Sequence, residues 1–296
     1  MRTFRIAVLA ALFGAVPAAS VLQASQAIAT DGISDVTYAT VNGKALRLDL
    51  YMPPGVARPP LVVWVHGGAW SGGVKTGYPL PVEYTQGGFA LAAIEFRLSS
   101  DAPFPAPVYD IKAAIRFLRA KSQQYGYRAD RIVLAGDSSG GHLAVFVGVT
   151  NGEKEFEGNV GGYFDQSSAV QGIIDYYGAT DLTTIVAQSR PYERTQRIPS
   201  LELFLGGPID ETLELAKTAT PIFHLDADDP PLLILHGDQD FTIPLEQSYE
   251  LLRAYEEAGL RVNLDVIKGA GHSGPPFFDK PHIAEALKFL KEILAP

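Results

Sequence analysis

The chain has 296 residues and contains no cysteine. That absence excludes a disulfide scaffold, a thiolate zinc site, a cysteine nucleophile and a lipidated N-terminal cysteine. Basic residues are also scarce, because 24 Lys and Arg stand against 33 Asp and Glu, which gives a net charge of −9. No run of basic side chains could contact the phosphates of a nucleic acid. The composition therefore argues against a nucleic-acid partner.

The six histidines lack the spacing of a metal site, such as two histidines four residues apart on one helix. We therefore expect no bound metal. Hydrophobic residues make up 47% of the chain and charged residues 19%, which is ordinary for a globular protein. The length suffices for one large domain with a substantial core.

The first 29 residues follow the pattern of a secretory signal peptide. Two arginines precede an apolar stretch at residues 6–16 that is too short to span a bilayer, and Ala27-Ile28-Ala29 has the small residues of a cleavage site. A buried N-terminal helix is the alternative. Cleavage would leave residues 30–296 with 22 basic and 33 acidic side chains, a net charge of −11. We expect an exported protein, periplasmic or extracellular, without a stable membrane anchor.

Apolar patterning along the rest of the chain predicts an α/β fold. Asn42-Gly43, between two alternating segments, is a strong signal for a β-hairpin, and the later continuous apolar runs are typical of strands in a parallel sheet. Expected strands span 35–41, 45–51, 61–65, 89–96, 131–135, 170–177, 231–235 and 262–267, and expected helices span 107–125, 139–149, 245–258 and 281–294. Because strands and helices alternate, we expect a mostly parallel central sheet with helices on both faces.

Residues 180–230 interrupt this alternation. They contain Pro191, Pro199, Pro221 and a Gly-Gly-Pro turn, with a short helical segment at 211–217. This region is either a small cap-like insertion over the sheet edge, which could bind substrate, or a plain surface excursion.

A Gly-Asp-Ser-Ser-Gly motif at residues 136–140 follows one of the expected strands and precedes an expected helix. Chance alone could supply Gly-x-Ser-x-Gly, but this setting is typical of the nucleophile elbow of α/β-hydrolases. Ser138 is then the candidate nucleophile, and Asp137 is expected to stabilise the turn. The motif's glycines allow strand and helix to approach closely around a strained serine.

Three further segments at the ends of expected strands complete an acyl-transfer site. In the His-Gly-Gly-Ala-Trp segment at 66–70, the amides of Gly68 and Ala69 could form an oxyanion hole together with that of Ser139, although an ordinary glycine turn is the alternative. Asp240 and His272 are the candidate carboxylate and general base, in the Ser…Asp…His order of α/β-hydrolases.

Asp238 is a second candidate carboxylate. We favour Asp240 because it lies deeper in the loop, just before the helix expected near Pro244. The other histidines are expected to be structural or unpartnered. His66 and His236 brace loops, and His142 is structural, whereas no partner is evident for His224 or His282.

Together these segments resemble the bifunctional feruloyl and acetyl-xylan esterases, a family related to the hormone-sensitive-lipase-like esterases. The resemblance begins near residue 46 and reaches the C-terminus; it includes the segments at 66–70, 96–98, 102–106, 136–144, 177–182, 236–240 and 269–272. It implies an α/β-hydrolase fold and a serine carboxylesterase, acting through an acyl-enzyme without a cofactor. The substrate would be a short-chain or aromatic ester, such as an acetyl or feruloyl ester, on a small molecule or a polysaccharide.

We expect Trp70, Phe241 and residues 180–230 to shape the substrate pocket. This chain departs from the related pattern at Ala69, where a third glycine is usual, and at Ser139, where alanine is usual. Phe241 replaces the more usual proline and would narrow the pocket.

Two other functions remain open. An amide hydrolase of the kynurenine formamidase type shares a similar glycine loop and elbow, but the expected export argues against it. A non-catalytic binding protein on a hydrolase scaffold is the other, and the presence of Ser138, Asp240 and His272 argues against that one.

Overall fold

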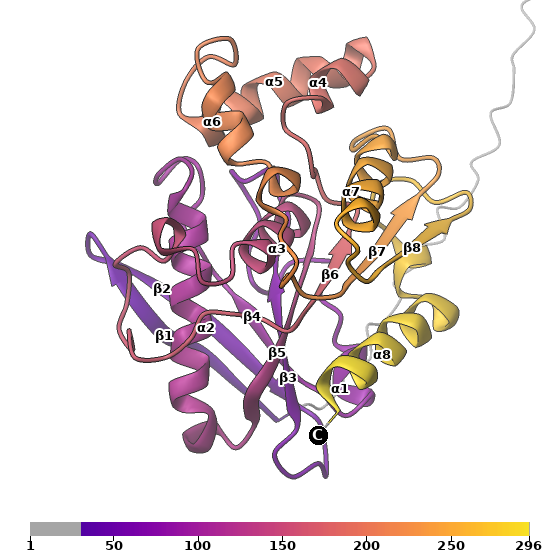
Figure 1. Cartoon of the computed structure of the whole chain (residues 1–296). Coiled ribbons are helices and arrows are strands. Elements are labelled where there is room, and N and C mark those ends of the chain that lie inside the picture. Colours follow the sequence, from indigo (N-terminus) through magenta and orange to yellow (C-terminus); the bar gives the residue numbers. More distant parts are fainter. Residues whose placement is uncertain (1–30, 296) are drawn as a thin grey trace, which may run out of the picture.

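The computed structural model describes residues 31–295. The expected signal peptide at residues 1–29 lies outside the described residues. The fold is an α/β-hydrolase fold built on one eight-stranded sheet with the strand order β1-β2-β4-β3-β5-β6-β7-β8 (Figure 1). The pairs β1–β2 and β2–β4 are antiparallel, and the other five pairs are parallel. The expectation of a mostly parallel sheet is confirmed.

The strands are β1 Asp31–Val41, β2 Lys44–Met52, β3 Pro60–Val65, β4 Ala90–Ile94, β5 Arg128–Asp137, β6 Gly172–Tyr176, β7 Leu232–Gly237 and β8 Val262–Ile267. The helices are α1 Glu83–Gln86, α2 Ala106–Tyr125, α3 Ser139–Val149, α4 Ile185–Gln188, α5 Pro191–Leu205, α6 Leu213–Thr218, α7 Glu246–Glu257 and α8 Lys280–Leu294. Short 3-10 turns occupy η1 Lys154–Phe156, η2 Pro221–His224 and η3 Pro275–Phe278. No helix within residues 31–295 is long and apolar enough to cross a membrane.

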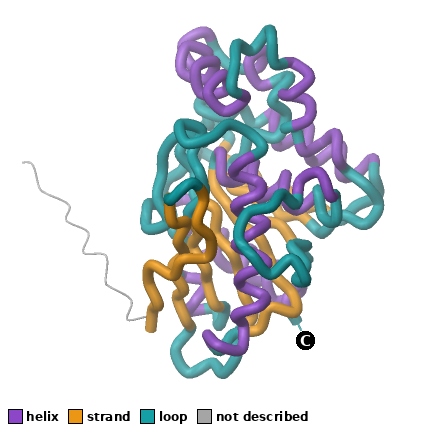
Figure 2. The backbone as a smooth tube through the Cα atoms, turned by 90° about the vertical axis from the view of Figure 1, so that its left-hand side faces the viewer, coloured by secondary structure: helices purple, strands orange, loops and turns teal. Residues whose placement is uncertain are grey.

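The sheet has a hydrophobic core on each face. Alternate residues of β3 divide between them, because Leu61, Val63 and Val65 pack on one side, and Val62 and Trp64 on the other. The first core is covered by α2, α3 and α7, and the second by α1 and α8 (Figures 1 and 2). Burial on both faces explains why the parallel strands appear in the sequence as continuous apolar runs.

The predicted hairpin is present between β1 and β2. Asn42 and Gly43 both have positive φ, 49° and 81°, as a tight two-residue turn requires. The twelve expected strands and helices are all found, with ends that differ by a few residues.

The region 180–230 is more helical than the sequence analysis predicts. Besides α6, it contains α4 and the fifteen-residue α5, which lie beyond one end of the strands (Figure 2). Pro191 begins α5 rather than ending a segment, since the first turn of a helix has no acceptor for its N–H groups. Pro199 lies inside the helix, and Gly206 ends it with a φ of 80°.

Candidate active site

Ser138 lies at the sharp turn between β5 and α3. Its φ of 53° and ψ of −122° are rare for a residue with a side chain. The turn is crowded, because a Cβ on Gly136 would stand 2.3 Å from the Gly140 carbonyl oxygen, and one on Gly140 would stand 2.2 Å from that of Val65. Only glycine at both positions lets β5 and α3 approach this closely. The Ser138 N–H donates to the Tyr176 carbonyl of β6 at 2.8 Å, which anchors the turn.

The structure brings Ser138, His272 and Asp240 together. His272 Nε2 lies 3.0 Å from Ser138 Oγ, and its Nδ1 lies 2.7 Å from Asp240 Oδ2. The serine follows β5, the aspartate follows β7 and the histidine follows β8, so the carboxyl ends of three strands supply the three groups. In this arrangement the imidazole can accept the serine proton while the carboxylate stabilises the charge that forms.

Asp238 lies elsewhere. Its side chain is exposed, and Oδ1 accepts the N–H of Gly269 at 2.6 Å, which braces the loop after β7 against the loop after β8. Of the two candidate carboxylates, the structure places Asp240 beside His272.

Asp240 is buried, accepts three hydrogen bonds and lies against a second imidazole. Oδ1 accepts the N–H groups of Thr242 and Ile243 at 2.8 and 2.9 Å. Oδ2 accepts from His272, and a second imidazole nitrogen, His236 Nε2, lies 3.2 Å from it. Burial raises the pKa of Asp240, but the hydrogen bonds from His236 and His272 outweigh it and bring the pKa to about 2. Asp240 is therefore ionised at neutral pH.

The loop after β3 adopts an unusual backbone conformation. Gly68, Ala69 and Trp70 all have positive φ, 126°, 53° and 57°. Among the hydrogen bonds within residues 31–295, none is donated by the backbone amides of Gly68, Ala69 or Ser139. The amide of Ser139 stands in the first turn of α3, where no intrahelical acceptor exists. Ala69, Ser138 and Ser139 line one hollow, so the amides of Ala69 and Ser139 are available to a negatively charged oxygen there, whereas Gly68 precedes Ala69 in the loop and is not among the lining residues.

Asp137 connects the elbow to this loop. Its Oδ1 accepts the N–H of Gly67 at 2.8 Å, and a Cβ on Gly67 would stand 2.5 Å from Oδ2. Burial raises the pKa of Asp137 to about 7, although the hydrogen bond from Gly67 lowers it. Among residues 31–295 its side chain forms no hydrogen bond with Ser138 or His272, and the bond from Gly67 agrees with the expected role in stabilising the turn.

Trp70 is buried and linked to the elbow helix. Its indole Nε1 donates to His142 Nδ1 at 3.0 Å, and His142 Nε2 donates to the Ala219 carbonyl at 2.8 Å. The indole also stacks on Phe204 of α5, with ring centroids 4.7 Å apart. Burial lowers the pKa of His142 to about 4, so the ring is neutral and can accept the indole proton.

A hollow of about 280 Å³ opens beside Ser138. One wall consists of the residues around the nucleophile and the loop after β7, and the other is formed by one face of α5. The lining residues are Ala69, Trp70, Ser138, Ser139, Tyr192, Glu193, Gln196, Arg197, Ser200, Phe241, Thr242 and Ile243. The region 180–230 thus lines this hollow through α5, and Trp70 and Phe241 lie in its wall.

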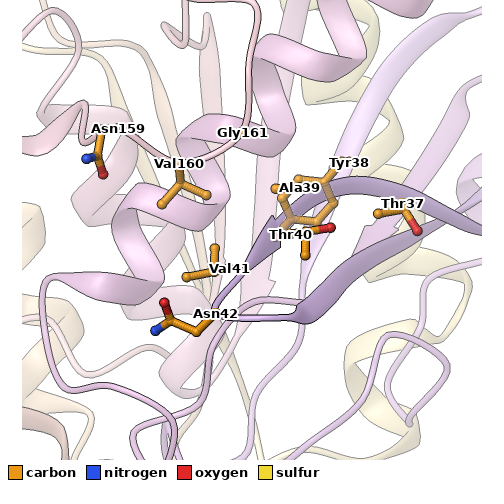
Figure 3. A pocket seen from close by; sticks show the side chains of 9 residues that line it. All are labelled: Thr37, Tyr38, Ala39, Thr40, Val41, Asn42, Asn159, Val160 and Gly161. Carbon is orange, nitrogen blue, oxygen red and sulfur yellow. The ribbon is translucent and has the colours of Figure 1, made fainter.

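A larger hollow of about 570 Å³ lies between the end of β1 and the loop at 159–161 (Figure 3). Tyr38 is its one titratable lining residue, and the Tyr38 hydroxyl already donates to the Glu95 carbonyl at 2.5 Å. It does not include Ser138. We therefore place the candidate active site in the smaller hollow, where the reactive groups converge.

Two arginines hold the insertion against the loop after β7. The Arg190 guanidinium lies 3.6 Å from the ring centroid of Phe241, a cation–π contact. Arg197 is buried; its Nε donates to Ser189 Oγ at 2.6 Å, and its Nη2 donates to the Thr242 carbonyl. Neither arginine can be identified from the sequence, because each contacts a segment about fifty residues further along the chain.

The remaining histidines form hydrogen bonds. His66 Nδ1 lies 2.9 Å from the Gly67 carbonyl, and both ring nitrogens of His236 have partners, which confirms that these two brace loops. The expectation that His224 and His282 lack partners is wrong. His224 Nε2 donates to the Thr218 carbonyl at 2.8 Å, and His282 Nδ1 lies 2.6 Å from Asp279, the residue that caps α8.

Comparison with known proteins finds that the chain is similar to esterases. The BD-FAE family model matches residues 48–255. Among curated proteins, the chain is similar to the esterase LipQ of Mycobacterium tuberculosis, with 30% identity over 232 residues that cover 76% of this chain and 53% of LipQ. The chain spans about half the length of the curated relatives it matches.

Two solved esterases share the fold. A truncated carbohydrate esterase from gut microbiota superposes with a TM-score of 0.80 at 30% identity, covering 90% of this chain and 96% of that one. The Est2 esterase of Thermogutta terrifontis with propionate bound has a TM-score of 0.70 at 27% identity, covering 88% of this chain and 95% of Est2. Est2 phosphorylated by paraoxon has a TM-score of 0.71 at 25% identity, covering 90% and 96%.

Proposed function

The chain belongs to the BD-FAE family, and from that premise we propose that it is a serine carboxylesterase that works through an acyl-enzyme. The observation that carries the proposal is the pair of contacts at His272, 3.0 Å to Ser138 Oγ and 2.7 Å to Asp240 Oδ2. The printed names of the relatives, which are esterases, support ester hydrolysis. The capture of Est2 by paraoxon supports a nucleophilic serine, since organophosphates react with activated serines.

In the first half-reaction, His272 Nε2 takes the proton from Ser138 as Oγ attacks the ester carbonyl carbon. The carbonyl oxygen gains a negative charge and accepts hydrogen bonds from the amides of Gly68, Ala69 and Ser139. Asp240 stabilises the imidazolium through its contact with Nδ1. His272 then gives its proton to the leaving alcohol oxygen as the ester C–O bond breaks, which leaves the acyl group on Ser138.

In the second half-reaction, water replaces the alcohol. His272 takes one proton from the water as its oxygen attacks the acyl carbon, and returns that proton to Ser138 Oγ as the acyl–Oγ bond breaks. The products are the carboxylic acid and the free serine.

The proposed substrate is an ester with a short-chain or small aromatic acyl group. The hollow of about 280 Å³ lies just below the ~300–1,000 Å³ typical of sites for drug-sized ligands. Trp70, Phe241 and Ile243 give it apolar walls suited to an acetyl or feruloyl-type group. An alcohol moiety on a small molecule or a polysaccharide would lie toward the open side, and the carbohydrate esterase among the structural neighbours supports a sugar there.

We also propose that the protein is exported, on the residue pattern of positions 1–29. Mass spectrometry of the protein recovered from the producing cells' periplasm or medium should find an N-terminus at Thr30. Full-length protein in the cytoplasm would contradict the proposal.

Hydrolysis of p-nitrophenyl acetate and butyrate by the wild type and by Ser138→Ala tests the function. Ser138→Ala should lose about 10³-fold or more in kcat, and paraoxon should label the peptide that contains Ser138. Ser167→Ala, a change at an exposed serine, is the matched control. An inert wild type, or full activity in Ser138→Ala, would contradict the proposal. Anilide analogues of the same acyl groups identify an amide hydrolase if they are cleaved faster than the esters.

A further inference from the structure

We propose that His236 is a positioning residue for the ester hydrolysis described above, holding Asp240 in the orientation that His272 requires. The inference rests on the proposed function. His236 lies in β7, four residues before Asp240, and is fully buried. It lines neither the hollow beside Ser138 nor the adjacent one that Asp240 borders, so it acts through Asp240 and not on a substrate.

The hydrogen-bond partners of His236 determine which ring nitrogen carries the proton. Nε2 lies 3.0 Å from the Ile243 carbonyl oxygen and 3.2 Å from Asp240 Oδ2. Both partners carry only acceptor oxygens, so Nε2 must be protonated; its N–H donates to the Ile243 carbonyl and lies against Asp240 Oδ2. Nδ1 then accepts a hydrogen bond from the hydroxyl of Ser248 in α7 at 2.6 Å. The two acceptor oxygens at Nε2 therefore select the tautomer of His236, and the Ser248 hydroxyl satisfies the unprotonated Nδ1.

The carboxylate of Asp240 is held from two directions. Oδ1 accepts two backbone N–H groups, which alone would leave Oδ2 held only by His272. His236 adds a second donor to Oδ2 from the buried side of the loop. His272 changes its protonation state during the reaction, whereas His236 stays in place. A fixed donor on Oδ2 keeps the carboxylate aligned with His272 Nδ1 throughout the cycle.

The same donor favours the ionised carboxylate. Burial raises the pKa of Asp240, and the hydrogen bonds from His236 and His272 bring it to about 2. The charged or titratable groups that face this pair are His272, Asp175 of β6 and Arg197 of α5. Removal of the His236 donor should raise the pKa of Asp240, because burial remains and one hydrogen bond is lost.

Two variants separate the effect of the His236 hydrogen-bond donor from the effect of its packing. His236→Leu fills much of the space without a donor, and His236→Gln places an amide N–H₂ near the position of Nε2. We expect His236→Leu to lower kcat by about 10- to 100-fold, the effect of one hydrogen bond to a charged group, with little change in KM. His236→Gln should recover most of that loss. His282→Leu, at a histidine paired with Asp279, should leave kcat unchanged.

The pH dependence of kcat/KM distinguishes a positioning role from a merely structural one, because loss of a structural contact alone would not change it. In the wild type Asp240 stays ionised, so protonation of His272 alone should govern the acid limb. In His236→Leu the carboxylate of Asp240 becomes more basic and stabilises the imidazolium of His272 more strongly, so the acid limb should shift to higher pH. Loss of packing alone would reduce the amount of folded enzyme and leave the shape of the profile unchanged.

Wild-type kcat together with a wild-type acid limb in His236→Leu would overturn the inference. If His236→Leu does not fold, His236→Gln is compared with His236→Asn, whose amide reaches only the position of Nδ1. Equal kcat values and equal acid limbs in those two variants would overturn it as well. Full activity in Ser138→Ala overturns the proposed function instead, which keeps the two failures apart.

Discussion

Replacement of Asp175 by asparagine should make the stability of the protein less dependent on pH. Asp175 lies in β6 and is fully buried. Its Oδ1 accepts the Gly178 N–H at 3.0 Å, and within residues 31–295 no hydrogen-bond partner is present for Oδ2. Burial raises the pKa of Asp175 to about 7, although the nearby His236 lowers it. Asparagine keeps the acceptor for Gly178 and removes the titration.

The sign and size of this pH effect on stability follow from the difference between the pKa of Asp175 in the folded and the unfolded state. An unfolded aspartate has a pKa of about 3.9, so the folded state retains the proton at pH values where the unfolded state has lost it. The contribution of this group is fully present below about pH 4 and is lost as the pH rises through about 7. At about 1.36 kcal/mol per pKa unit, the wild type should lose about 2.5 kcal/mol of unfolding free energy through Asp175 between pH 5 and pH 8.

Urea unfolding of the wild type and Asp175→Asn at pH 5 and pH 8 measures how the unfolding free energy of each protein depends on pH. The stability of the variant relative to the wild type should be about 2.5 kcal/mol more favourable at pH 8 than at pH 5. This double difference cancels any steric cost of asparagine, provided that the cost is equal at both pH values. Asp210→Asn, at an exposed aspartate, is the control. Equal relative stability of Asp175→Asn at the two pH values would refute the reasoning.

Three other predictions concern the catalytic machinery and the elbow. Asp240→Asn should lower kcat/KM for p-nitrophenyl acetate by about 10³- to 10⁴-fold, because the amide cannot stabilise the imidazolium. Asp238→Asn should lower kcat/KM by less than about tenfold. A larger loss in Asp238→Asn than in Asp240→Asn would show that the carboxylates are wrongly assigned. Trp70→Phe removes the indole N–H that lies 3.0 Å from the buried Nδ1 of His142 in the wild type. Urea titrations should show that the unfolding free energy falls by about 1–3 kcal/mol. An unchanged unfolding free energy would mean that this hydrogen bond contributes nothing to stability. Gly140→Ala should destabilise by about 3 kcal/mol or more, or prevent folding, because the new Cβ would stand 2.2 Å from the Val65 carbonyl; a wild-type thermal midpoint would contradict the crowding at the elbow.

The sequence predicts the strands and helices of the fold well because burial follows the repeat of each element. Strands covered on both faces, such as β3 and β7, appear as continuous apolar runs, and α2 and α8 have one apolar face. The same frame leads to Ser138, Asp240 and His272, since each follows a strand whose carboxyl end reaches the same edge of the sheet. Local sequence therefore suffices where a residue's position follows from the strand before it.

Local sequence does not suffice to predict contacts that depend on tertiary structure. The prolines at 191 and 199 predict interruption, yet one begins α5 and the other lies within it. The contact of His236 with Asp240 depends on the tight turn after β7, in which the Asp240 N–H donates to the Gly237 carbonyl at 3.3 Å. The four-residue spacing of this histidine and aspartate was the available signal, but only the folded turn shows that the two side chains meet.

Under the proposed function, the contacts of α5 couple substrate selection to catalysis. Arg197 lines the hollow beside Ser138 and also donates to the carbonyl of Thr242, whose N–H binds Asp240 Oδ1. Trp70 lies in the same wall and reaches Ala219 of the insertion through His142. A change in the insertion that widens the hollow therefore also acts on the loops that hold Asp240 and the oxyanion amides. Variation of substrate range through α5 should change kcat together with KM, because the walls of the pocket and the supports of the catalytic groups are the same residues.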